Sequence, residues 1–65
     1  MSEQEREILS TCSRGYQRVE VIHARLVRRW PLLTCREIDA SIASLVDAGK
    51  LITKSIGPHR KYMRA

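Results

Sequence analysis

The sequence predicts a single small domain, mainly α-helical, in which three helices precede a β-hairpin. Three observations lead to this fold class. The chain has 65 residues, which suffices for one domain over residues 1–65. Apolar residues recur at helical spacing in three segments, and Gly15, Pro31 and Gly49 separate these segments from their neighbours. The last segment is rich in β-branched residues and contains a Gly-Pro pair, which is typical of a hairpin.

The first helix is expected over about residues 3–13. Ser2 and Glu5 stand at the two positions of a capping box, and the early glutamates suit the positive end of a helix dipole. A short apolar stripe follows, made of Ile8, Leu9 and Cys12. Gly15 stops the helix, and a short extended stretch is expected at residues 16–18.

The second helix is expected over about residues 19–30. Its apolar face has offsets of 3, 4, 7, 8 and 11, and consists of Val19, Ile22, His23, Leu26, Val27 and Trp30. Arg25 and Arg28 lie on or beside the opposite face. Pro31 ends the helix, because a residue before proline is pushed out of the α region.

The third helix, over about residues 35–48, has the clearest signals. Thr34 and Glu37 form a second capping box. The apolar face consists of Cys35, Ile38, Ile42, Leu45 and Val46. Gly49 stands where a left-handed residue closes a helix. Asp39 falls at the edge of the apolar face, where we expect it to pair with an arginine of the second helix.

A β-hairpin is expected over about residues 51–64, with turn chemistry at residues 56–60. Its tip is basic, with no acidic residue nearby: Lys54, His59, Arg60 and Lys61. A lone two-stranded hairpin is marginally stable in water, so it must pack against the helices.

Charge is distributed in blocks. The net charge is +5, and residues 48–65 carry five cations and no acid, while residues 37–47 carry three acids and no cation. Basic blocks attract polyanions, of which DNA is the commonest for a folded basic domain. A chain this short has no room for a deep substrate cavity with its supporting shell, so we expect neither an enzyme nor a small-molecule substrate.

The order of helix, helix, tight turn, helix and basic hairpin resembles the winged helix-turn-helix family of DNA-binding domains. Val19 to Arg64 carry the resemblance, most clearly the stretch Thr34–Ser55, in which the run Ala48-Gly49-Lys50 leads from the third helix straight into a strand. The resemblance implies a three-helix winged helix-turn-helix fold that binds double-stranded DNA. The third helix would enter the major groove, and the hairpin would lie on the backbone or in the minor groove.

This resemblance implies a role in sequence-specific recognition, as a small transcriptional regulator or an accessory factor of a phage or mobile element. Arg36 could bond a guanine, and small residues let the helix lie close to the bases. The candidate DNA-binding residues are Thr34, Arg36, Ala40, Ser44, Arg25, Arg28, Lys54, His59, Arg60 and Lys61. One copy offers a small interface, so a homodimer or adjacent copies on DNA are expected, with Val21 at such a contact.

Two other functions stay open. The acids of the third helix favour a winged-helix protein-protein interaction module that does not bind DNA, and a fragment of a nucleic-acid-processing enzyme is the third alternative. No cofactor or metal is expected, because no two of the cysteines and histidines are spaced along the sequence like a ligand pair of a structural zinc site. Both cysteines fall on apolar faces and should be free thiols in a cytoplasmic protein. No stretch has the length of a membrane span.

Overall fold

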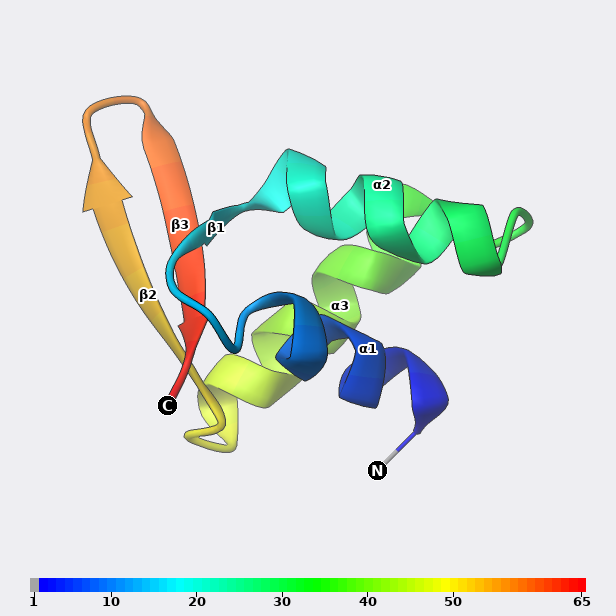
Figure 1. The fold of residues 1–65 in the computed structure, drawn as a ribbon, viewed down its shortest axis with the longest axis horizontal. Helices are drawn as coiled ribbons and strands as arrows, with labels where there is room; N and C mark the ends of the chain where they lie inside the picture. The colour runs from blue at the N-terminus through cyan, green and yellow to red at the C-terminus, as the bar shows by residue number, and fades with distance from the viewer. Residues whose placement is uncertain (1) are drawn as a thin grey trace.

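The computed structural model describes residues 2–65, which form three α-helices and a three-stranded antiparallel sheet (Figure 1). The elements in chain order are α1 (Glu3–Thr11), β1 (Gln17–Arg18), α2 (Val19–Arg29), α3 (Cys35–Asp47), β2 (Leu51–Ile56) and β3 (His59–Arg64). The predicted order of three helices followed by a hairpin is confirmed. Figure 1 shows the hairpin at one end of the molecule and the three helices beside it.

Both predicted capping boxes are present, and they explain where α1 and α3 begin. Ser2 caps α1, and its backbone N–H donates to Oε1 of Glu5 at 3.0 Å. Hydrogen bonds from the backbone and the hydroxyl group of Ser2 lower the pKa of Glu5. The helices end slightly earlier than predicted, by two residues in α1 and by one in α2 and α3. In α2 the reason is Trp30, whose φ of −126° leaves the helical region directly before Pro31.

A glycine turn connects α3 to the sheet. Gly49 has a φ of 75°, in the left-handed region that glycine adopts at least cost. Its N–H donates to the carbonyl of Val46 at 3.0 Å, and the N–H of Lys50 donates to the carbonyl of Leu45 at 2.9 Å. These two bonds form a Schellman motif, which satisfies the last carbonyls of α3 and directs the chain into β2.

The sheet has the strand order β1-β3-β2, so β3 is central. β2 and β3 pair in register from Leu51↔Arg64 to Ile56↔His59. The turn is therefore only the Gly57-Pro58 pair, and the wider turn predicted at residues 56–60 is wrong. Gly57 has a φ of 59°, as the first position of a type II′ turn requires.

The extended stretch predicted at residues 16–18 becomes β1. Gln17 pairs with Tyr62, and Arg18 pairs with Lys61. These two pairs turn the predicted two-stranded hairpin into a three-stranded sheet. Because Arg18 is followed directly by Val19, the first residue of α2, β1 anchors the sheet to the helices, as the marginal stability of a lone hairpin requires.

The core lies between the three helices and the start of β2. It consists of Ile8, Cys12, Ile22, Leu26, Ile38, Ile42, Leu45 and Leu51. Trp30 and Tyr62 are partly buried and pack against it. Burial of each large aliphatic side chain contributes about 1.5–3 kcal/mol.

Two residues predicted to lie on buried faces are exposed. Val27, at the edge of the apolar stripe of α2, is 39% exposed. Cys35 is also exposed, because it is the first residue of α3 and the first turn of that helix extends beyond the core. None of the helices within residues 2–65 has the length and apolar character needed to cross a bilayer.

Candidate nucleic-acid interface

The exposed residues of α3 are small or charged, and they are Cys35, Arg36, Glu37, Asp39, Ala40, Ala43, Ser44 and Asp47. Ile38, Ile42 and Leu45 are buried against the core, while Ala40 and Ser44 on the other side are exposed. Arg36, in the first turn of the helix, is exposed at the end of the same side. The predicted face of α3 is therefore free to contact another molecule, and its small side chains let that molecule approach the helix backbone closely.

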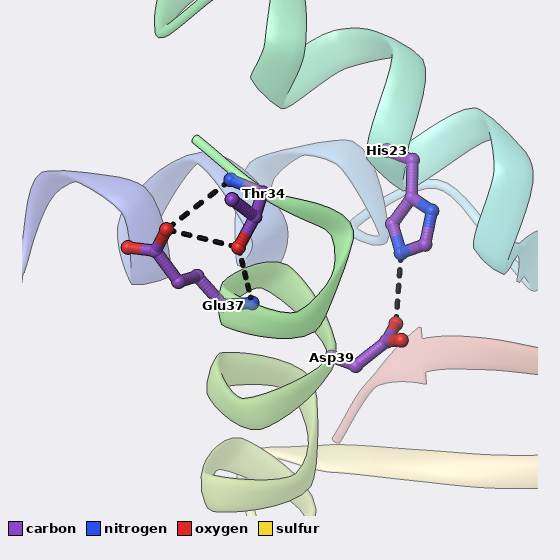
Figure 2. A network of polar contacts seen from close by, with 4 residues as sticks. All are labelled: His23, Thr34, Glu37 and Asp39. Carbon is purple, nitrogen blue, oxygen red and sulfur yellow. Dashed lines mark hydrogen bonds and ion pairs between the residues drawn. The ribbon is translucent and has the colours of Figure 1, made fainter. Parts of the chain in front are cut away.

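The hydroxyl group of Thr34 serves the helix cap (Figure 2). It donates to Oε1 of Glu37 at 2.9 Å and accepts from the backbone N–H of Glu37 at 3.2 Å. The N–H of Thr34 donates to the same carboxylate oxygen at 3.3 Å. Both side chains are thus held at the start of α3, and the negative charge of Glu37 lies beside the positive end of the helix dipole.

Asp39 pairs with His23 of α2. The distance between Nε2 of His23 and Oδ1 of Asp39 is 2.8 Å, and Figure 2 shows the two side chains pointing toward each other between the helices. The prediction that Asp39 pairs with an arginine of the second helix is wrong. Arg29 instead extends to α1, where it lies 3.6 Å from Glu3 and 3.8 Å from Glu7. His23, predicted on the apolar face of the second helix, lies at the edge of the core with its side chain 22% exposed.

A groove of about 330 Å³ separates α3 from the sheet. Its lining residues are Asp39, Ile42, Ala43, Val46, Asp47, Thr53, Arg60 and Tyr62. Arg60 is the only cation in this set, and it comes from β3, near the tip of the hairpin. Arg60 therefore lies next to α3, on the side of the helix that lines the groove.

The strand register divides the predicted basic tip between two faces of the sheet. Residues paired across antiparallel strands point to the same face, and neighbours along a strand alternate. Ser55↔Arg60 follows Thr53↔Tyr62 on the face toward α3. Lys54↔Lys61 and Ile56↔His59 lie on the opposite face. The structure thus brings Arg60 to α3, and it places Lys54, His59 and Lys61 away from it.

The two candidate arginines of α2 lie apart from α3. Arg25 lines a polar pocket with Ser10, Arg14 and Gln17, on the side of α2 that faces α1. Arg28 is exposed one helical turn farther along. The ten predicted residues therefore form three groups: Thr34, Arg36, Ala40, Ser44 and Arg60 near α3; Lys54, His59 and Lys61 on the opposite sheet face; and Arg25 with Arg28 on α2.

The cysteines have different environments. Cys12 is completely buried, and burial raises the pKa of its thiol from 9.0 to about 11. Cys35 is exposed, and both thiols are free. Within residues 2–65, the histidine, cysteine and acidic side chains form no group of three that could hold a metal ion.

Neither the comparison with models of known protein families nor the comparison with curated proteins finds a match to this chain.

Proposed function

We propose that this chain is a winged helix-turn-helix domain that binds double-stranded DNA sequence-specifically, as a small transcriptional regulator or an accessory factor of a phage or mobile element. It acts by binding and not as an enzyme. The observation that carries the proposal is the exposed face of α3, where the small residues Ala40 and Ser44 follow Arg36 and lie beside a hairpin that contributes Arg60. This arrangement suits the docking geometry of the family that the sequence resembles.

In this proposal α3 enters the major groove along its exposed face. Ala40 and Ser44 allow a close approach, and Arg36 bonds the O6 and N7 atoms of a guanine. Arg60 contacts a phosphate at the edge of the groove. Two of the three acids on α3 are held by partners within the protein: Glu37 in the cap, and Asp39 against His23.

Single copies offer little surface to DNA, since the molecule measures only 30 × 24 × 20 Å. Specific protein–DNA interfaces commonly bury more than about 1,000 Å² of protein surface. We therefore propose that two copies bind together, as a homodimer or on adjacent sites. Val21 is 40% exposed on the outer side of α2 and is the residue we assign to a contact between copies.

Salt dependence of binding tests the proposal first. Fluorescence anisotropy with labelled random-sequence duplex DNA is measured over a range of salt concentrations. Phosphate contacts release counterions, so affinity should fall steeply as salt rises. In a plot of log affinity against log salt concentration, Arg60→Ala should make the slope shallower by about the amount that one phosphate contact contributes. Arg6→Ala, which removes the same charge from an exposed position on α1, is the matched control and should leave the slope nearly unchanged.

Target selection from the same DNA pool then tests the role of α3. On the selected duplex, Arg36→Ala should cost about 1–3 kcal/mol of binding free energy and relax the preference at one base pair. If wild-type protein binds no duplex even at low salt, the DNA-binding proposal fails, and the protein-protein interaction module becomes the better account.

A further inference from the structure

The sheet face that points away from α3 combines positive charge with exposed apolar surface. We call it the outer sheet face and define it by six residues: Arg18, Lys54 and Lys61, which are basic, and Tyr16, Ile52 and Ile56, which are apolar. The register places Arg18, Lys61 and Lys54 in one row across β1, β3 and β2. Adjacent strands lie about 4.8 Å apart, so this row crosses the whole sheet within about 10 Å.

The cation row has no acidic partner. Like charges directly opposite each other on a sheet destabilise it, and here Lys61 faces a cation on both sides. The ion pairs within residues 2–65 involve other side chains. Every acid of the described chain lies on a helix, and the strands contain none. Only Lys54 has a compensating contact, with its Nζ 5.6 Å from the centre of the Tyr16 ring.

The apolar residues of this face are unusually exposed. Tyr16 is 37%, Ile52 40% and Ile56 45% exposed, and they are three of the six large apolar side chains exposed among residues 2–65. Along β2 the outward-facing residues alternate as Ile52, Lys54 and Ile56. These exposed apolar side chains, interspersed with cations, offer surface that a binding partner could cover.

We propose that the outer sheet face binds an extended polypeptide segment of a partner protein in which acidic and apolar side chains alternate. Carboxylates would neutralise the cation row, and apolar side chains would cover Ile52, Ile56 and Tyr16. A phosphate backbone would supply the charge but leave the apolar side chains in water. A second copy placed face to face would set one cation row against the other.

This inference goes beyond DNA binding and does not depend on it. The outer sheet face points away from α3, so the domain could bind a partner segment and a duplex at the same time. The domain would then connect DNA to a second protein.

The test uses a short labelled peptide in which glutamate alternates with leucine, measured by anisotropy without DNA. Wild-type protein should bind it. Lys61→Glu should weaken binding roughly tenfold or more, since it reverses the central charge of the row. Arg60→Glu is the matched control: it makes the same charge change one residue away, on the other face of β3, and should leave peptide affinity within about twofold. If the Lys61→Glu protein does not fold, Lys54→Glu on the exposed edge strand β2 repeats the test.

Two further probes examine the apolar contribution. Ile56→Ser should weaken peptide binding by a few-fold while changing no charge. A peptide with serine in place of leucine should bind more weakly than the original. The proposal is overturned if wild-type protein does not bind the alternating peptide, if the serine peptide binds equally well, or if Arg60→Glu weakens binding as much as Lys61→Glu does. Because DNA is absent from these mixtures, their failure leaves the DNA-binding proposal untouched.

Discussion

The two cysteines differ chemically, although the sequence pattern treats them alike. Cys12 lies in the core with no exposed surface, and burial raises the pKa of its thiol to about 11. Cys35 occupies the first turn of α3 in solvent. Only Cys35 should therefore react quickly with a thiol reagent in the folded protein.

Burial of Cys12 makes stability depend on alkaline pH. The folded state keeps the thiol proton up to about pH 11, whereas the unfolded chain loses it near pH 9.0. The free energy of unfolding should thus be insensitive to this group below pH 9 and fall by roughly 1–2 kcal/mol between pH 9 and 11.

Urea unfolding at a series of pH values measures this effect, with Cys12→Ala as the control. The variant should lose stability less steeply than wild type over the same interval, because it lacks the buried thiol and is otherwise identical. Parallel curves for the two proteins would contradict the assignment of this pH dependence to Cys12.

At this scale, helical spacing in the sequence predicts the apolar stripes but not every ion pair between helices. Helical spacing placed Ile22, Leu26 and Ile38 correctly in the core. It could not choose the partner of Asp39, since spacing gives the direction of a side chain within one helix and not how two helices approach each other. For the same reason, the edge residue Val27 was wrongly assigned to the buried face.

At the scale of elements, local hydrogen bonding determines where the helices begin and end. Two capping boxes and a Schellman motif satisfy the backbone groups that helix ends leave unpaired. Because these motifs depend on a few neighbouring residues, the sequence predicted the starts of α1 and α3 and the glycine that follows α3. The β1 strand has only two residues, so its pairing with β3 depends on tertiary structure that no local pattern encodes.

The cap of α3 provides a test at this scale. Thr34→Ala removes the hydroxyl group that bonds Glu37 and should lower the free energy of unfolding by about 1 kcal/mol. Thr34→Ser retains the hydroxyl group and should restore most of this loss. Thermal or urea unfolding of the three proteins makes the comparison. Equal stability of Thr34→Ala and wild type would mean that the cap contributes nothing to the fold.

At the scale of the whole molecule, sheet register divides the candidate site. The sequence predicted a single basic tip, since Lys54, Arg60 and Lys61 lie close together along the chain. In the sheet, Arg60 faces the groove beside α3, while Lys54 and Lys61 join Arg18 on the other face. The alternation of strand residues is a local property, but which face meets α3 depends on how the hairpin packs. The place of Arg18 in this row depends on the pairing of β1 with β3, which no local pattern in the sequence predicts.

This division underlies the proposal of two binding surfaces on one small domain. The side formed by α3 and Arg60 is proposed to read duplex DNA, and the outer sheet face is proposed to bind an acidic and apolar segment. Although the two residues are adjacent, substitution of Arg60 should therefore weaken mainly DNA binding, and substitution of Lys61 should weaken mainly peptide binding.

The most direct test of DNA binding through the α3 side is to compare Arg60→Glu with Lys61→Glu on a selected duplex at constant salt. Both variants change the net charge equally, so long-range electrostatics should lower the DNA affinity of both by a similar amount. We predict that Arg60→Glu weakens DNA binding about tenfold more than Lys61→Glu, because only Arg60 lies beside α3. Equal losses would contradict the account, and a larger loss for Lys61→Glu would contradict it and place the DNA on the outer sheet face.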